Sequence, residues 1–246
     1  VQVDFFSAIG TDLISDKLLA AVENEKLGSS LLLRSKTARP GLYMINTDAF
    51  GERSFVYWRD SSAAKQTLQL FRARNDVTPL TSADWFYFSG ISLAILSQDD
   101  REDLFSLVAE LKAAGVNIGF DPNYRPVLWQ SVQLCRDAFE RAYALSDIAL
   151  PGLDDHKVLF NAQTCDDVIK QLKALGTGEI VVKNGKDGAV VWAGGERFAM
   201  PAVTVKKVVD TTAAGDSFNG GYLAARLAGQ SPKAAAQLAA ALAGFV

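Results

Sequence analysis

The chain has 246 residues, of which 49% are hydrophobic, so it can bury the core of one large α/β domain with a small appendage. Its formal net charge of -3 argues against nucleic acid or a membrane surface as a partner, because both require a basic face. Cys135 and Cys165 are its two cysteines, which argues against a disulfide framework or a cysteine-built metal site and fits the reducing cytoplasm.

The first predicted unit is a strand followed by a helix. Residues 3–9 form a mostly apolar run that Gly10 closes, and residues 12–25 place leucines and a valine at helical spacing. Gly10 and Asp12 are interpreted as structural: the glycine ends the strand and the aspartate caps the helix.

Between residues 31 and 65 the pattern changes to alternation, which predicts a β-hairpin. Two alternating segments, around Met44 and Val56, flank a glycine-bearing turn at 48–52. A short β excursion inside an α/β chain is typical of a flap over a site. Its aromatic and basic side chains either point into a substrate or pack and guard a sheet edge, and the pattern alone favours the edge. These side chains are Tyr43, Tyr57 and Arg59.

Residues 85–120 predict a buried strand, an amphipathic helix and a second buried strand. A polar cluster bounded by prolines, residues 121–129, follows the second strand, at the end where parallel sheets bind ligands. Arg125 offers a planar fork that matches a carboxylate bidentately. The alternative is a structural ion pair between Asp121 and Arg125 that fastens the loop, and it stays open.

The middle of the chain predicts another helix over residues 131–144 and a short strand over 148–150. Asp154 is then a candidate N-cap for the next helix. His156 is the only histidine. Because no second nitrogen or thiol ligand is near it in the sequence, we interpret His156 as a surface residue rather than a metal ligand.

Residues 179–183 predict a strand, and the glycine-containing segment 183–189 predicts a turn. Such a turn either lines a phosphate or closes a β-hairpin, and the hairpin is favoured. The sequence has no Gly-x-Gly-x-x-Gly string after a strand and no Walker A string, which disfavours a dinucleotide dehydrogenase and a P-loop enzyme.

Residues 209–221 hold the pattern around which the chain is organised, a predicted strand, tight turn and helix. The first-turn amides of such a helix attract a phosphate. The carboxylate of Asp216 would repel an anion that is only bound there. A role as general base suits it better, in which it takes a proton from a hydroxyl that attacks the phosphoryl group. The alternative is a helix capped by Thr211 or Thr212, with Asp216 placed to suit the dipole, and the pattern leaves both open. The amides concerned belong to Ala213, Ala214 and Gly215.

The string Asp-Thr-Thr-Ala-Ala-Gly-Asp-Ser-Phe at 210–218 resembles the C-terminal signature of the ribokinase-like (PfkB) carbohydrate kinases, and its alanine pair resembles the 2-keto-3-deoxygluconate kinase branch. Asp-Pro-Asn-Tyr-Arg-Pro at 121–126 and Tyr-Trp-Arg-Asp at 57–60 resemble further segments of that branch. The resemblance implies an α/β fold: a three-layer sandwich with a mostly parallel central sheet between helices, and a small β lid. It places the kinase core in 1–33 and 66–246 and the lid in 34–65.

The resemblance also implies a reaction and a set of roles. ATP would phosphorylate the terminal hydroxyl of 2-dehydro-3-deoxy-D-gluconate, with Asp216 as the base and the amides of Ala213, Ala214 and Gly215 as the anion hole. Sugar-acid contacts carried over from the family are Tyr43, Tyr57, Arg59, Arg125 and Asp216. ATP contacts carried over are Asn123, Lys183, Gly185, Gly188 and Gly215.

The metal implied by the family is Mg²⁺. Many relatives organise it with an Asn-x-x-Glu motif, where this chain has Gly152 and Asp155. Gly152 supplies no side chain, so an indirect role for Asp155 is the remaining expectation and competes with a purely structural one. The family further implies a homodimer formed through the β lid.

Two alternatives to this function remain: a related sugar kinase of the fructokinase or ribokinase type, and a catalytically silent binding module. Val1 starts within strand-like sequence, and a final helix opened by Ser231 and Pro232 runs to Val246, so we expect a chain truncated at both termini. The family's first strand and its Gly-Gly-Asp loop would then precede Val1.

Overall fold

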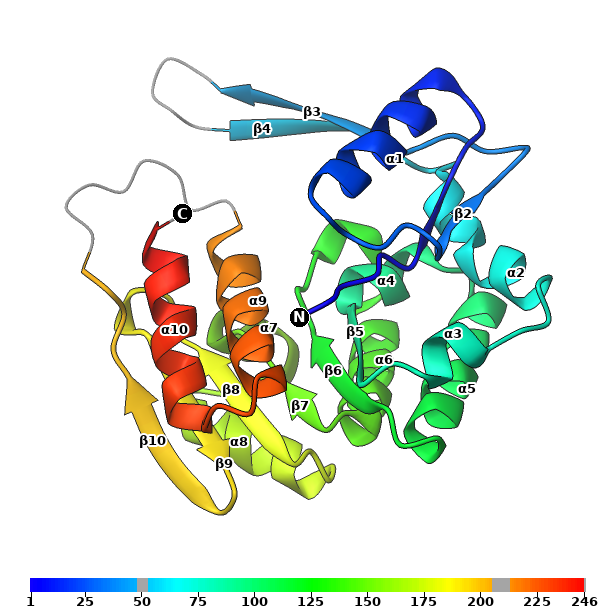
Figure 1. Cartoon of the computed structure of the whole chain (residues 1–246). Coiled ribbons are helices and arrows are strands. Elements are labelled where there is room, and N and C mark those ends of the chain that lie inside the picture. Colours follow the sequence, from blue (N-terminus) through cyan, green and yellow to red (C-terminus); the bar gives the residue numbers. More distant parts are fainter. Residues whose placement is uncertain (48–52, 205–212, 246) are drawn as a thin grey trace. The chain divides into compact units, whose positions relative to one another are not determined.

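The computed structural model describes residues 1–47, 53–204 and 213–245 (Figure 1). The chain divides into two compact units. The first contains Val1, Pro79–Ile95 and Phe105–Val246, and the second contains Gln2–Thr78 and Leu96–Leu104. Each unit is described by itself below. No helix within the described ranges is long and apolar enough to cross a membrane.

The first unit is built on a six-stranded sheet with the strand order β10-β9-β8-β7-β6-β5. The four strands β5 to β8 are parallel, and β9 is antiparallel to both of its neighbours. Because parallel strands end at a common edge, side chains that follow β6 and β8 come together there. The strands are β5 (Trp85–Ser89), β6 (Asn117–Asp121), β7 (Ile148–Ala149), β8 (Glu179–Lys183), β9 (Ala189–Ala193) and β10 (Glu196–Met200).

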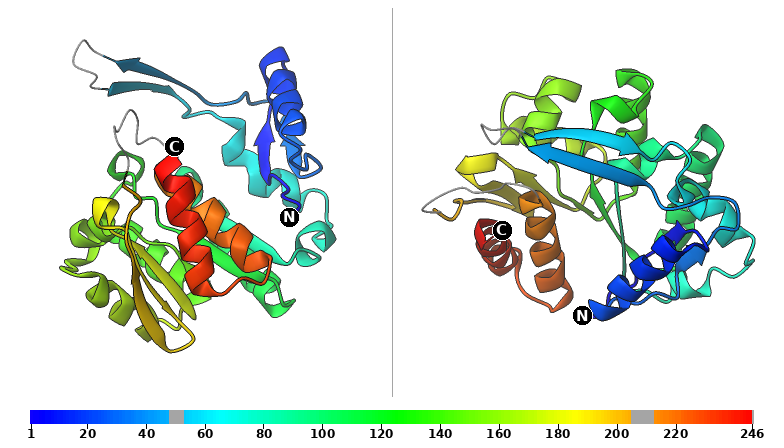
Figure 2. Two further views of the ribbon diagram at one scale, coloured as in Figure 1. Left: turned by 60° about the vertical axis from the view of Figure 1, so that its left-hand side comes forward. Right: turned by 90° about the horizontal axis from the view of Figure 1, so that it is seen from above.

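Helices cover both faces of this sheet, which gives three layers (Figures 1 and 2). On one face, Phe218 and Tyr222 of α9 pack with alanines of α10 against Val181 and Val191 of the sheet. On the other, Phe120 of β6 packs its ring against Phe139 of α6 at 5.6 Å. The helices are α4 (Gly90–Ile95), α6 (Val132–Leu145), α7 (Leu153–Phe160), α8 (Cys165–Ala174), α9 (Ala214–Leu227) and α10 (Pro232–Phe245), with the short 3-10 turns η2 (Pro126–Leu128) and η3 (Gly185–Asp187). The helix α5 (Gln98–Ala113) begins in the second unit and continues into the first from Phe105.

The second unit pairs β1 with β2 in parallel and β3 with β4 in an antiparallel hairpin. Asp12 caps α1, since its Oδ1 accepts hydrogen bonds from the amides of Ile14 at 3.0 Å and Ser15 at 3.2 Å. The elements are β1 (Ser7–Ile9), α1 (Leu13–Asn24), β2 (Leu32–Arg34), β3 (Leu42–Thr47), β4 (Arg53–Trp58), η1 (Ala63–Gln66) and α2 (Thr67–Arg72). α3 (Thr78–Thr81) starts at the last residue of this unit and continues into the first.

Most predicted elements of the α/β pattern are confirmed, including the hairpin and the glycine turn between β8 and β9. The strand expected over 3–9 is shorter, because regular pairing begins at Ser7 and is preceded by an isolated bridge from Asp4 to Gly28. The hairpin turn at 48–52 lies outside the described residues. The separation of 34–65 as a lid stays a prediction.

Two predictions about α7 are wrong. Gly152, not Asp154, is the N-cap of this helix, and Asp154 lies in its first turn. His156 is fully buried rather than exposed, because the helix turns it inward together with Leu153 and Leu159. Its ring lies 5.6 Å from that of Tyr143. Desolvation lowers the pKa of His156 to about 4, against a weaker opposing effect of its contact with the Gly152 carbonyl.

Candidate active site

The tip of α9 presents the backbone amides of the first helical turn. Ala213 is the N-cap in a left-handed conformation, with φ of 63°, and no side chain accepts a capping hydrogen bond from this helix within the described residues. Thr211 and Thr212, the alternative caps, lie outside those residues. A Cβ added at Gly215 would meet nothing within 4 Å, so the backbone there is open to approach. A helix tip of this kind suits an anion.

Asp216 lies in the first turn of α9 and is exposed. Its carboxylate is therefore not packed among apolar side chains. Its charge also acts on Tyr87 of β5. Desolvation is the largest cause that raises the pKa of Tyr87, and the charges of Asp121 and Asp216 raise it further, while a hydrogen bond from Asn219 lowers it. Although Tyr87 is exposed as a residue, its hydroxyl accepts that bond within the polar network described next.

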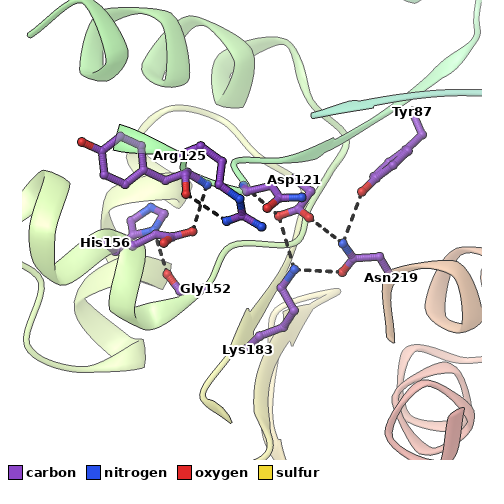
Figure 3. A network of polar contacts seen from close by, with 10 residues as sticks. Tyr87, Asp121, Arg125, Gly152, His156, Lys183 and Asn219 are labelled. Atoms are coloured by element: carbon purple, nitrogen blue, oxygen red, sulfur yellow. Dashed lines mark hydrogen bonds and ion pairs between the residues drawn. The ribbon is translucent and has the colours of Figure 1, made fainter. Parts of the chain in front are cut away.

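A polar network joins α9 to the carboxyl ends of β6 and β8 (Figure 3). Asn219 donates from Nδ2 to Asp121 Oδ2 at 2.7 Å and to the Tyr87 hydroxyl at 3.2 Å. Lys183 Nζ donates to Asn219 Oδ1 at 3.1 Å and pairs with Asp121 Oδ1 at 3.3 Å. The side chain of Asp121 is 4% exposed and that of Lys183 19%, so this is a nearly buried ion pair whose remaining polar atoms have partners.

This network corrects the alternative reading of the loop after β6. Asp121 pairs with Lys183 and not with Arg125. Arg125 is exposed, and its Nη1 donates to the Tyr124 carbonyl at 3.0 Å. The outer part of its guanidinium therefore faces solvent, where it can receive a planar anion.

Asp155 lies close to the same loop. Its Oδ2 accepts a hydrogen bond from the Tyr124 amide at 3.2 Å. Burial raises the pKa of Asp155, as does Asp121, while the Tyr124 amide, Lys183 and Arg125 act in the opposite direction. No group of three His, Cys, Asp or Glu side chains able to hold a metal ion exists among the described residues. Mg²⁺ that retains water and binds phosphate oxygens requires only one or two carboxylates, so Asp155 fits an indirect role.

The loop between β8 and β9 approaches the rest of the unit closely at one of its glycines. Gly188 has φ of 89°, and a Cβ there would lie 2.0 Å from the Met200 carbonyl oxygen. At Gly185 a Cβ would meet nothing within 4 Å, so this part of the loop is open. Asn123 lies two residues after the end of β6, has φ of 36°, and donates a hydrogen bond from its backbone amide to Asp121 Oδ1 at 3.2 Å.

The three predicted lid residues come together within the second unit. Tyr43 and Tyr57 are cross-strand partners in the hairpin, with ring centroids 6.3 Å apart. The guanidinium carbon of Arg59 lies 4.0 Å from the centroid of the Tyr57 ring. Both tyrosines are exposed. The hairpin thus presents two phenols and one cation on a single face, a combination that suits a hydroxylated anion.

The first unit holds the remaining predicted residues around the strand ends and the α9 tip. Sequence reasoning did not identify Tyr87 and Asn219 as members of this group. The spacing of Asn219 from Asp216, three positions along one helix, would have placed both on one face. Tyr87 had no comparable signal, because its contact with Asn219 spans 132 positions.

A family model described as pfkB family carbohydrate kinase matches residues 1–246. The chain is 44% identical over 240 residues to 2-dehydro-3-deoxygluconokinase of Escherichia coli (strain K12), a match that covers 96% of this chain and 78% of the relative. It is 42% identical to the enzyme of the same name from Dickeya dadantii (strain 3937), with 96% and 77% covered.

Two solved structures are similar across 99% of this chain. The PfkB protein from Polaromonas sp. JS666 has a TM-score of 0.89 and 27% identity, with 79% of its own chain covered. A putative ribokinase II from E. coli in complex with ATP and Mg²⁺ has a TM-score of 0.85 and 26% identity, with 76% covered. The ribokinase-like α/β fold expected from the sequence is confirmed.

Proposed function

Because the chain belongs to the pfkB family of carbohydrate kinases, we propose that it transfers a phosphoryl group from ATP to the 6-hydroxyl of 2-dehydro-3-deoxy-D-gluconate. The products are ADP and 2-dehydro-3-deoxy-6-phosphogluconate. The observation that carries the proposal is the 44% identity, over 96% of the chain, to an enzyme named for this reaction. The exposed Asp216, beside a helix tip that no described side chain caps, supports it independently.

Asp216 is the general base of the proposed reaction. Its carboxylate takes the proton of the 6-hydroxyl while that oxygen forms a bond to the γ-phosphorus of ATP. The bond between the γ-phosphorus and the β,γ-bridging oxygen breaks, and its electron pair leaves with ADP. Asp216 is exposed in the structure, so its carboxylate is accessible to a hydroxyl before substrate excludes water.

The first-turn amides of α9 stabilise the charge on the moving phosphoryl group. Ala213, Ala214 and Gly215 supply these donors, and the open space beside Gly215 lets phosphate oxygens approach the backbone. Donors held in place before the reaction stabilise the transition state without reorganisation. The helix dipole acts in the same direction.

We assign the carboxylate end of the sugar acid to Arg125, and separate contacts with the sugar acid to Tyr43, Tyr57 and Arg59 of the hairpin. Arg125 keeps the outer part of its guanidinium in solvent and can form a bidentate pair. Arg59 is ordered by its contact with the Tyr57 ring, which reduces the entropy lost on binding. These cations distinguish a sugar acid from a neutral sugar.

ATP is the phosphoryl donor, and we assign its contacts to Asn123, Lys183, Gly185, Gly188 and Gly215. At the strand ends, Lys183 forms an ion pair with Asp121. This pair neutralises the negative charge of Asp121, which would otherwise repel the phosphates. When bound, Mg²⁺ neutralises charge on the phosphate oxygens. Asp155 would hold it through water, and Gly152 contributes no side chain.

Two broader features complete the proposal. The protein acts in the cytoplasm, where ATP is available, and it forms a homodimer through the β3–β4 hairpin. The support for the dimer is the exposure of Leu42, Met44, Val56 and Trp58, which share one face of this two-stranded sheet. An isolated two-stranded ribbon of this composition gains stability by burying that face.

The test of the proposed function is a coupled assay of ADP release with a panel of sugar acids and neutral sugars. The expected result is ATP-dependent turnover with 2-dehydro-3-deoxy-D-gluconate and a lower kcat/KM with fructose and ribose. Preference for a neutral sugar would replace the assignment by the related sugar kinase. Absence of ADP release with every sugar would favour a silent binding module.

A further inference from the structure

Asn219 lies one helical turn beyond Asp216, so the two side chains share a face of α9. Asp216 is exposed, whereas Asn219 is 2% exposed. The same face therefore carries an exposed carboxylate in the first turn and, one turn further along, a buried amide. Figure 3 shows that amide, Asn219, among its partners on the sheet.

The amide of Asn219 is held in one orientation. Its Nδ2 donates to the Asp121 carboxylate at 2.7 Å and to the Tyr87 hydroxyl at 3.2 Å, and its Oδ1 accepts from Lys183 at 3.1 Å. A carboxylate can only accept and an ammonium can only donate, so a flipped amide would lose both charge-assisted bonds. Three strands, β5, β6 and β8, thus fix one side chain of the helix.

Within the described residues, polar contacts attach α9 to the sheet at two levels. Near its far end, Tyr222 and Arg226 bond to Glu179, with the Tyr222 hydroxyl at 2.6 Å from Oε1. Near the tip, Asn219 makes the attachment. No side chain among the described residues caps the first turn. Asn219, one turn below, is therefore the polar attachment nearest to the first-turn amides in that part of the chain.

We propose that Asn219 is a positioning residue for phosphoryl transfer: through Asp121, Lys183 and Tyr87 it fixes the tip of α9, and with it Asp216 and the first-turn amides, against the strand ends. The inference rests on the proposed function and adds a residue to it. Asn219 touches neither the sugar nor ATP in this account. Misplacement of a reacting group by about 1 Å costs up to about a hundredfold in rate, so loss of this attachment acts on kcat.

The experiment compares the parent with Asn219→Leu, Asn219→Asp and the exchange variant Asp121→Asn/Asn219→Asp. Each is measured for kcat, for KM of both substrates and for thermal unfolding. Asn219→Leu is expected to lower kcat by about ten- to a hundredfold with little change in either KM. Asn219→Asp sets two carboxylates against each other at the position of the 2.7 Å bond and lowers kcat at least as far.

The exchange variant separates positioning from general stability. It restores an amide and a carboxylate facing each other, with Lys183 still able to bond both, so kcat is expected to recover most of the loss seen in Asn219→Asp. Asn117→Leu is the matched control, because Asn117 lies at the opposite end of β6, is exposed and bonds to the Asp84 carbonyl. Its kcat should equal that of the parent.

The inference is overturned if folded Asn219→Leu keeps the parent kcat, if its loss is confined to KM, or if the exchange variant is no more active than Asn219→Asp. The last comparison stands even if Asn219→Leu does not fold. An inactive parent would instead overturn the proposed function, and this inference with it, so the two failures are distinguishable.

Discussion

At the scale of single residues, we assign to the charge of Arg125 the distinction between an acidic substrate and a neutral one. Its Nη1 is held by the neighbouring Tyr124 carbonyl, which orients the guanidinium but leaves its outer edge exposed. A fork presented in this way binds a carboxylate through two parallel hydrogen bonds, a geometry that lysine does not reproduce.

Replacing Arg125 with alanine should therefore change specificity more than overall activity. We expect kcat/KM for the sugar acid to fall about thirtyfold or more, which corresponds to a loss of about 2 kcal/mol of transition-state stabilisation, while kcat/KM for a neutral sugar changes little. Arg125→Lys should lie between alanine and the parent. Equal losses on acidic and neutral sugars would contradict the assignment of Arg125 to the carboxylate.

His156 gives a pH dependence that belongs to stability and not to catalysis. Its folded-state pKa is about 4, below the ordinary value of 6.5, because burial disfavours the charged ring. Between those values the unfolded chain binds a proton that the folded chain does not. Stability is therefore fully present above about pH 6.5 and is lost as pH falls toward 4, by about 1.4 kcal/mol per pH unit from this group.

Denaturant unfolding at several pH values measures this effect. The parent should lose unfolding free energy between pH 6.5 and pH 4 more steeply than His156→Gln, which does not titrate there. The comparison between the two proteins cancels the contribution of the carboxylates common to both. Parallel stability curves would show that His156 titrates alike in the folded and unfolded states.

At the scale of elements, the contact of α9 with α10 depends on one of two adjacent glycines in the middle of α9. A Cβ at Gly221 would lie 2.6 Å from Leu242 Cδ1 and 3.2 Å from the Cα of Ala239. At Gly220, one position earlier, a Cβ would meet nothing within 4 Å. Gly221 therefore allows the two helices to pack closely, because any side chain there would clash with α10. Gly220 plays no part in this contact.

The pair supplies a matched experiment on thermal unfolding. Gly221→Val should destabilise the protein by about 1–3 kcal/mol, because the added methyl groups force α10 away from α9. Gly220→Ala should stabilise it by up to about 1 kcal/mol, since alanine favours the helix and has room there. A destabilised Gly220→Ala together with an unchanged Gly221→Val would contradict the helix packing described.

At the scale of the whole molecule, the β3–β4 hairpin leads us to expect a dimer. Trp58 and Met44 are more than half exposed and lie on the same face of the ribbon. We expect sedimentation equilibrium to give a dimer for the parent, and Trp58→Asp to weaken it by placing a charge in the apolar contact. A monomeric parent, or a mutant that dimerises equally well, would rule out this face as the interface.

Much of the fold was predictable from the sequence because its signals are local. Apolar runs that end at Gly90 and Asp121 mark strands, and Asp12 marks the start of a helix. β10 escaped prediction because this edge strand is mostly exposed and carries Glu196 and Arg197, so it lacks an apolar run. The sequence did contain a local sign that His156 is buried, because it lies three positions after Leu153 and so shares a helix face with it. The polarity of histidine argued against burial.

The candidate site was predictable only in part. The α9 tip and Asp216 follow from one contiguous stretch, and its resemblance to a known signature supplied their roles. The pairing of Asp121 with Lys183 spans 62 positions, and the bond from Asn219 to Asp121 spans 98. Contacts between such distant positions depend on the order of strands in the sheet, which a single sequence does not specify.

Asp216 is the proposed base that takes the proton from the attacking hydroxyl. The variant Asp216→Asn tests this role most directly, because the amide keeps the size of the carboxylate but cannot act as the base. Single-turnover transfer of the phosphoryl group from ATP to 2-dehydro-3-deoxy-D-gluconate should slow by about a hundred- to ten-thousandfold, with ATP binding retained. A variant that transfers the group within a fewfold of the parent rate would contradict the claim.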